Sequence, residues 1–257
     1  MNLTEMRTRV REDLQDEDEA NYRWSNDEVV GAIQRVVREF SLAYPFMEST
    51  DIATTDGSNE LDISSLSGFS GLIAIASVEF PIGEDPACYQ RVELWKTTLY
   101  MQDKGNGDDA RVRWYKEHTL LGSIAWAINT AYALGAIVIP TANNGLWYEC
   151  TTAGTSAGSE PTWPIVEGAT VVDNTATWTC RKPTIPAQLE EIIVLGATGY
   201  LATSASVYTA DRATIAGRYA TVNFLKWGQE RLELYQKKLK AIGRNNRIIT
   251  REFYTDA

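Results

Sequence analysis

Apolar residues near the start of the chain recur at helical spacing. Four of them fall three or four positions apart and would share one face of a helix over residues 3–14. These residues are Leu3, Met6, Val10 and Leu14. A second helix is expected after Ser25, because Ser25 and Glu28 form the S-x-x-E pattern of a capping box. Its apolar stripe runs to Phe40, and Pro45 ends it. The sequence therefore predicts a helical hairpin here.

Between Met47 and His118 the pattern changes to that of β-strands. The stretch "LIAIASVEF" predicts a buried strand, and "ARVRWYKEH" alternates apolar and polar positions. Asp-Gly at 56–57 predicts a tight turn, and the loop "DKGNGDD" between Tyr100 and Ala110 is typical of a hairpin. We therefore expect a small antiparallel sheet.

Helical periodicity returns after Pro186, a residue that is tolerated in the first turn of a helix. Glu190 and Glu191 follow, as expected near the positive end of a helix dipole. A last helix is predicted over about 221–242, where Gly243 provides a natural stop.

Residues 123–182 differ from the sequence on either side of them. They contain few charged residues, many Thr, Gly and Ala, and four of the eight tryptophans. Turn residues separate short strand-like pieces, which predicts a small all-β module inserted into a surface loop, where insertions are best tolerated. The predicted organisation is a host domain at 1–122 and 183–243, the inserted module at 123–182, and a C-terminal arm at 244–257.

Composition narrows the function classes. The formal charge of −10 disfavours nonspecific binding of nucleic acid, which depends on Lys and Arg displacing counterions. Three Cys in 257 residues argue against a disulfide framework and for a reducing compartment. Cys150 and Cys180 lie in matching contexts, "WYEC" and "TWTC", so they either pair or occupy equivalent core strands. No apolar run is long enough for a membrane span, and the first ten residues lack a signal-peptide pattern, which predicts an intracellular product.

No group of residues has the pattern of a catalytic site. Gly196, Gly199 and Ala202 resemble the nucleotide-binding turn of extended short-chain dehydrogenases, but no alternating strand and helix pattern surrounds them. Close helix packing is the favoured interpretation of these small residues. The single His118 excludes a multi-histidine metal site, and the carboxylates from Glu12 to Glu19 lack a chelating turn pattern. We expect no enzyme activity, no metal and no cofactor.

The inserted segment resembles a known class of module. "WAINTAYALGAIVIP", followed by "WYECTTAGTSAGSEPTW" and "TWTCR", is similar to the small chitin- and cellulose-binding-type modules of phage virion proteins. Such modules stack sugar rings on exposed aromatic faces. The resemblance implies candidate contacts for a ligand or a protein, and the alternative is that the same side chains form the core of the module. The candidates are Trp126, Tyr132, Trp147, Tyr148, Trp163 and Trp178.

The rest of the chain resembles the head-to-tail connector (adaptor) proteins of tailed bacteriophages. The similarity covers most of 1–122 and 183–257 and is strongest in "DEDEANYRWSNDEV". It implies an α+β chain with a mainly helical adaptor domain and a small antiparallel sheet, to which the module is added. It further implies a virion protein of the neck that assembles in the host cytoplasm as a dodecameric ring on the portal protein. Its other partners would be the tail or stopper protein and the packaged DNA, which would pass through the lumen without sequence-specific binding.

In that family the C-terminal segment commonly acts as an arm that grips the portal. Here the polar segment "GRNNRIITREFYTDA" has apolar residues at intervals, as expected of a segment that orders on binding, although a disordered tail would look the same. The candidate portal-binding residues are Arg244, Arg247, Ile248, Ile249, Arg251, Phe253 and Tyr254. The alternative function is a carbohydrate-binding module for adhesion on a helical carrier, with no membrane partner in either case.

Overall fold

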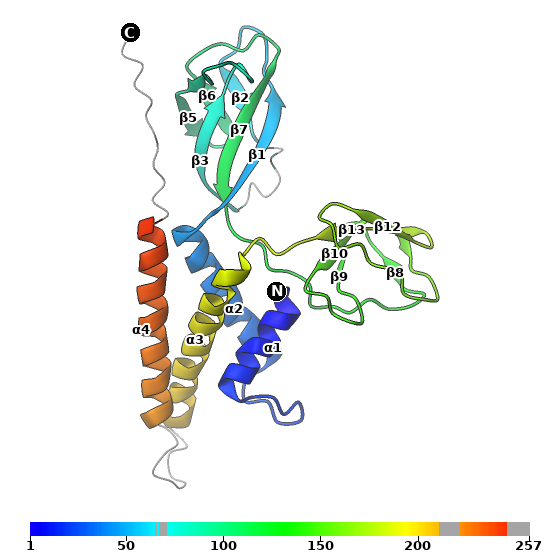
Figure 1. Cartoon of the computed structure of the whole chain (residues 1–257), viewed down its shortest axis with the longest axis vertical. Helices are drawn as coiled ribbons and strands as arrows, with labels where there is room; N and C mark the ends of the chain where they lie inside the picture. Colours follow the sequence, from blue (N-terminus) through cyan, green and yellow to red (C-terminus); the bar gives the residue numbers. More distant parts are fainter. Residues whose placement is uncertain (65, 67–70, 211–221, 246–257) are drawn as a thin grey trace. The chain divides into compact units, whose positions relative to one another are not determined.

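The computed structural model describes residues 1–64, 66, 71–210 and 222–245, without the side chains of 205–210, 222–224 and 245. Within these residues the chain is α+β, with four α-helices and four small antiparallel sheets (Figure 1). The expectation of a mainly helical adaptor domain is wrong, because residues 46–116 between the second and third helices carry seven strands in two sheets.

The chain divides into two compact units. The first contains Met1–Glu39 and His118–Lys240, and the second contains Phe40–Glu117 with Ala241–Ala257. The first unit includes both the helical part and residues 123–182, so the division of these into separate domains stays a prediction.

The two predicted N-terminal helices are confirmed. Helix α1 (Leu3–Leu14) is capped by the side chain of Asn2, which accepts a hydrogen bond from the Glu5 N–H. It ends at Gln15, which adopts a left-handed conformation with φ of 54°. Helix α2 (Asn26–Ala43) begins with the predicted capping box: the Glu28 N–H donates to Ser25 Oγ at 3.2 Å, and the Ser25 N–H donates to Glu28 Oε2 at 2.8 Å.

The second pair of helices contains glycines where helices pass close together. A 3₁₀ turn (η2, Ala187–Leu189) leads into α3 (Glu190–Ala210), and α4 (Val222–Asn245) follows. A Cβ added at Gly196 would lie 2.9 Å from Val36 Cγ1, and one at Gly199 would lie 2.9 Å from Leu232. Buried Ala202 lies against Gly228 in the same way. The packing interpretation of this motif is confirmed, because its glycines lie within a helix against side chains of α2 and α4.

Gly243 does not stop the last helix, contrary to the expectation. Helix α4 continues through Gly243 to Asn245. A Cβ at this position would meet Ala43 Cβ at 3.6 Å, an ordinary contact distance. A glycine inside a helix costs only about 1 kcal/mol relative to alanine, so the neighbouring turns of α4 can continue through it.

The second unit contains two sheets that face each other across one core. Sheet A has the order β1 (Phe46–Ala53), β7 (Asp109–Lys116), β3 (Leu72–Glu79), β4 (Tyr89–Gln90). Sheet B has the order β2 (Glu60–Asp62), β6 (Thr98–Met101), β5 (Val92–Trp95). The shared core includes Leu61, Leu99 and Met101 of sheet B with Val78, Val112 and Trp114 of sheet A.

Three sequence expectations for this unit need correction and one is confirmed. One small sheet was expected where there are two. The loop between Tyr100 and Ala110 is no hairpin, because β6 pairs with β2 and β5 while β7 pairs with β1 and β3. The loop therefore crosses from one sheet to the other. Strand β3 forms where it was predicted, but it is mostly half-buried, since Val78 and Glu79 are its buried residues. The alternation of β7 is confirmed, because Val112 and Trp114 are fully buried.

Residues 123–182 form short strands, as predicted. One sheet has the order β12 (Thr170–Asp173), β13 (Ala176–Arg181), β10 (Trp147–Thr152), β9 (Ile137–Val138). A second sheet pairs β11 (Gly154–Thr155) with β8 (Ala131–Tyr132). We call residues 123–182 the inserted module from here on.

The inserted module is hydrogen-bonded to the start of α1. The buried Asn2 side chain donates to Asn143 Oδ1 at 2.7 Å and to the Leu146 carbonyl at 2.9 Å. The Leu3 and Thr4 N–H groups donate to the carbonyls of residues 121 and 122, where the chain enters the module. The cap of α1 therefore also anchors the base of the inserted module.

Candidate functional site

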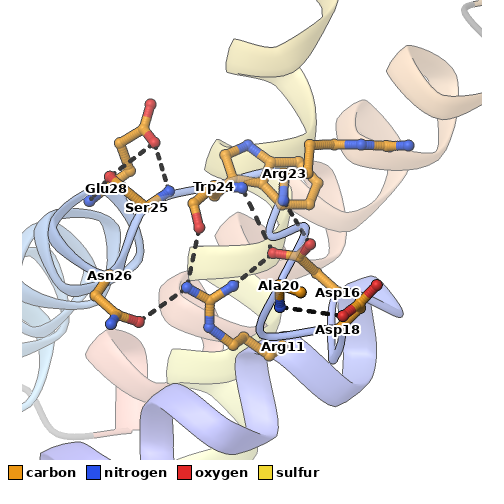
Figure 2. Close-up of polar contacts among 9 residues, drawn as sticks. All are labelled: Arg11, Asp16, Asp18, Ala20, Arg23, Trp24, Ser25, Asn26 and Glu28. Carbon is orange, nitrogen blue, oxygen red and sulfur yellow. Dashed lines mark hydrogen bonds and ion pairs between the residues drawn. The ribbon is translucent and has the colours of Figure 1, made fainter.

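The connection between α1 and α2, residues 15–25, is held by a buried ion pair (Figure 2). Arg11 extends from the last turn of α1, and its guanidinium Nη1 lies 2.5 Å from Asp16 Oδ2. Its Nη2 donates to the Trp24 carbonyl and to Asn26 Oδ1, both at 2.9 Å. One side chain thus joins the end of α1, the connection and the start of α2.

Asp16 completes this network from the other side. Its Oδ1 accepts the Arg23 N–H at 2.7 Å, and its Oδ2 faces the Trp24 N–H at 3.5 Å (Figure 2). The Tyr22 ring covers the guanidinium, with its centroid 3.5 Å from Arg11 Cζ. Because both charges are buried, removal of either partner would leave the other uncompensated.

The connection presents its remaining carboxylates to solvent. Glu17, Asp18 and Glu19 are exposed. Asp18 accepts hydrogen bonds from the Asn21 amide and the Ala20 N–H, which lower the pKa of its carboxyl. The predicted solvated acidic run is confirmed for these three residues, whereas Asp16 in the same run is buried. The result is a fixed turn with an acidic outer surface.

A shallow groove of about 440 Å³ is lined by residues of α1, α3 and α4. Arg231 of α4 donates to Asp13 Oδ1 at 2.6 Å and stacks on the Trp227 ring, 4.3 Å from its centroid. The floor includes Val194 and Leu195 of α3. Asp13 Oδ2 is buried without a hydrogen-bond partner, so the groove holds one carboxylate oxygen that is not satisfied within the described residues. Opposite charges line it, which gives it no strong preference for an anion or a cation.

A polar cluster joins the three longer helices inside the first unit. Glu39 of α2 accepts hydrogen bonds from the hydroxyls of Tyr200 on α3, at 2.8 Å, and Tyr235 on α4, at 3.1 Å. Arg35 stacks on Tyr200 and pairs with Glu39 at 3.1 Å. Burial raises the pKa of the fully buried Tyr235, so its hydroxyl stays a donor at neutral pH. This cluster fixes helix register and offers no open site for a ligand.

Five of the six candidate aromatics of the inserted module form its core cluster or pack against it, whereas Trp147 is buried outside that cluster. Trp126, Trp147, Tyr148 and Trp178 are at most 7% exposed, and Tyr132 and Trp163 are half-buried and pack against the same cluster. The Tyr148 and Trp163 rings lie 4.2 Å apart. None of the six presents the fully exposed ring face that stacking on a sugar requires. Their placement supports the core interpretation and not the contact interpretation.

Asp173 holds two of these indoles in place. Its Oδ2 accepts the Trp126 Nε1–H at 2.8 Å and the Trp178 Nε1–H at 3.0 Å. Its Oδ1 accepts the Ala157 N–H at 2.8 Å. The side chain is buried, and every hydrogen bond described for this carboxylate comes from a neutral donor. Asp173 and Arg11 were not predicted as functional residues, because neither belongs to a motif. Asp173 is marked only as a lone charge in an uncharged segment, and nothing distinguishes Arg11 from the other charges of its helix.

The cysteines and the histidine have structural positions. Cys150 and Cys180 are buried free thiols on adjacent strands, where Cys150 pairs with Trp178 and Cys180 with Tyr148, so the equivalent-strand interpretation is confirmed. Burial raises the pKa of both thiols. His118 is buried, with Nδ1 3.0 Å from Thr184 Oγ1.

The candidate arm lies mostly outside the described residues. Arg244 is exposed in the last turn of α4. The remaining candidates lie outside the described residues: Arg247, Ile248, Ile249, Arg251, Phe253 and Tyr254. In the described part of the chain no cluster of three His, Cys, Asp or Glu side chains is placed to hold a metal ion. No helix among those residues is long and apolar enough to cross a membrane.

Comparison with known proteins does not assign the chain to a family. No protein-family model matches it, and no curated protein matches it in sequence.

Proposed function

We propose that the protein is a structural subunit of a tailed-phage virion, a head-to-tail adaptor that forms a ring on the portal and joins it to the tail. The observation that carries the proposal is the α1–α2 connection. Asp16, the first residue of the stretch with the strongest resemblance to adaptors, forms a buried ion pair with Arg11 of α1 that fixes one turn geometry. Because the buried ion pair holds the turn in one conformation, every copy of the chain presents the same surface there. A subunit of a ring needs this uniformity, although burying the two charges has an energetic cost.

The charge of the chain supports a role beside DNA. The formal charge is −10, and the connection exposes Glu17, Asp18 and Glu19. A negatively charged lumen repels DNA and lets it slide, whereas a basic lumen would retain it. The packaged DNA would therefore pass through the ring without sequence-specific binding.

The C-terminal arm is the proposed contact with the portal. Helix α4 ends with Arg244 exposed in its last turn. The residues after α4 combine two arginines with apolar side chains at intervals, a pattern suited to a segment that docks on another protein. The other proposed partners are further copies of the chain, twelve in a ring, and a tail or stopper protein.

The inserted module is the part of the proposed subunit that would contact a neighbour outside the ring. Its exposed large side chains are aliphatic, whereas its aromatics are buried or half-buried. The exposed residues are Ile124, Ile128, Leu134, Ile165, Val166 and Val172. Aliphatic side chains favour contact with a protein over stacking on a sugar ring, so the placement of the aromatics disfavours the alternative of carbohydrate binding.

The experiment is co-purification of the full chain with the portal protein encoded by the same phage, followed by negative-stain microscopy. We expect rings with the full chain and their loss when residues 244–257 are removed. A matched control replaces Arg244, Arg247 and Arg251 by Lys, which keeps the charge and weakens bidentate contacts. A full-length chain that stays monomeric and does not bind the portal would contradict the proposal.

A further inference from the structure

The two sheets of the second unit have outer faces with different charge arrangements. On sheet A, Arg111 of β7 binds Asp51 of β1 through Nε at 2.8 Å and Nη2 at 2.9 Å. Arg113 of the same strand binds Glu79 of β3 at 2.7 Å. The charges of this face are therefore neutralised by partners on the neighbouring strands.

On the outer face of sheet B, no such pairing occurs among the residues that the structure describes. Leu61 and Leu99 point into the core, so the residues that alternate with them point outward. The strand register arranges these outward residues in two rows across β2, β6 and β5. The rows are Glu60, Tyr100, Glu93 and Asp62, Thr98, Trp95. We call these six residues the acidic aromatic face.

The carboxylates and Trp95 of this face are exposed, and none of the carboxylates has a cationic partner among the described residues. Trp95 is 65% exposed. The carboxylates of Glu60 and Glu93 have no ion-pair or hydrogen-bond partner among the described residues, whereas Asp62 accepts hydrogen bonds from Ser64. The nearest cations in sequence, Arg91 and Lys96, flank β5 and lie outside the two rows.

Carboxylates beside exposed aromatic rings are suited to arginine. A guanidinium pairs with a carboxylate through two N–H groups and stacks on an indole or phenol ring. An extended segment would also place aliphatic side chains against Trp95. The complementary ligand is therefore an extended peptide in which arginines alternate with aliphatic residues.

We propose that the acidic aromatic face binds the C-terminal segment of the same chain, residues 246–257. In an extended segment Arg247, Ile249 and Arg251 share one side, because side chains alternate along the backbone. This side carries two arginines and an aliphatic residue, which matches the carboxylates and rings of the face in charge and in shape.

The position where α4 ends makes the contact possible within one chain. Helix α4 ends at Asn245, and Gly243 in its last turn lies against Ala43. Ala43 precedes β1 by three residues, and both Ala43 and Gly243 belong to the unit that contains sheet B. The twelve residues 246–257 could span about 40 Å when extended. A unit of roughly 80 residues is only about 30 Å across.

This contact goes beyond the proposed function and does not depend on it. If the protein is an adaptor, an arm bound to the acidic aromatic face of its own subunit would reach the portal only when the portal competes with that face for it. Only this consequence rests on the proposed function. The test below uses no portal, so its failure is distinct from a failure of ring formation.

The experiment is limited trypsin digestion of the full chain, with cleavage after Arg247 and Arg251 followed by intact mass spectrometry. Trp95→Ala, and separately Glu60→Gln combined with Glu93→Gln, should each accelerate this cleavage about fivefold, because cleavage follows the population of the released arm. Glu84→Gln and Met47→Ala change exposed residues of the same unit outside the face and should leave the rate unchanged.

A second measurement examines the contact from the arm. Arg247→Gln combined with Arg251→Gln should increase hydrogen exchange at 93–100 in the full chain, with no change in the inserted module. Equal cleavage rates in wild type and all face variants, or unchanged exchange at 93–100, would overturn the proposal. Protection that rises with protein concentration would overturn the assignment to the same chain.

Discussion

The α1–α2 connection and the inserted module each depend on one buried aspartate, and they satisfy it in different ways. Asp16 is paired with the guanidinium of Arg11, so a full charge pair is removed from water. Asp173 is held by two indole N–H groups and one backbone N–H. The comparison shows why aromatic-rich sequence need not indicate a binding platform: in a module of 60 residues, the large rings and their polar anchor form the core.

The largest effect is expected at the ion pair. Arg11→Met should destabilise the helical part by about 3–5 kcal/mol, because it leaves the Asp16 carboxylate buried without its cation. Hydrogen exchange measured by mass spectrometry should show faster exchange in α1 and α2 and no change in the strands of the inserted module. Arg38→Met, at an exposed position of α2, is the matched control. Unchanged exchange in α1 would show that the pair does not hold the connection.

The corresponding change in the inserted module should have a somewhat smaller effect. Asp173→Ala removes a carboxylate and leaves two buried indole N–H groups without an acceptor, which should cost about 2–4 kcal/mol. Exchange should rise in β10 and β13 while α1 and α2 stay protected. Glu149→Ala breaks the exposed pair with Arg181 and should cost less than about 1 kcal/mol. Equal costs for the two variants would contradict the role of Asp173.

Two glycines in the helical part should respond to alanine in opposite directions. Gly196→Ala should destabilise by about 1–3 kcal/mol, since its Cβ would lie 2.9 Å from Val36 and 3.0 Å from Tyr235. Gly31→Ala, on α2 with no atom within 4 Å, should stabilise by about 0.5–1 kcal/mol. Urea unfolding followed by far-ultraviolet circular dichroism measures both. Two shifts of the same sign would argue against close packing at Gly196.

A small effect is also expected at the cap of α2. Ser25→Ala should cost about 1 kcal/mol, because the Glu28 N–H loses its acceptor. Ser25→Asp keeps an acceptor at the same position and should restore most of this stability. The same unfolding measurement compares the three proteins, and an alanine variant as stable as wild type would show that the capping box is not needed.

The helices were predictable because their signals are local. The stripe from Leu3 to Leu14 and the box formed by Ser25 and Glu28 reappear in the structure at the predicted positions. Sheet pairing was not predictable, because the loop between β6 and β7 has hairpin chemistry and yet joins two sheets. Strand partners depend on contacts between residues far apart in sequence, which periodicity alone does not reveal.

The candidate site shows the same division. The sequence identified the connection as the segment to examine, but not that Arg11 reaches Asp16, Trp24 and Asn26 from inside a helix. It also identified the aromatics of the inserted module, but their burial depends on how six short strands pack. Gly196 and Gly199 were interpreted correctly because the absence of surrounding strand and helix alternation excludes a nucleotide-binding turn.

The central claim is that the chain assembles on a portal as a ring, and the most direct test is native mass spectrometry of the full-length protein mixed with its portal. The account predicts one complex that contains twelve copies of the chain per portal ring. A spectrum with only free portal and monomeric chain, at concentrations where both proteins are folded, would contradict it.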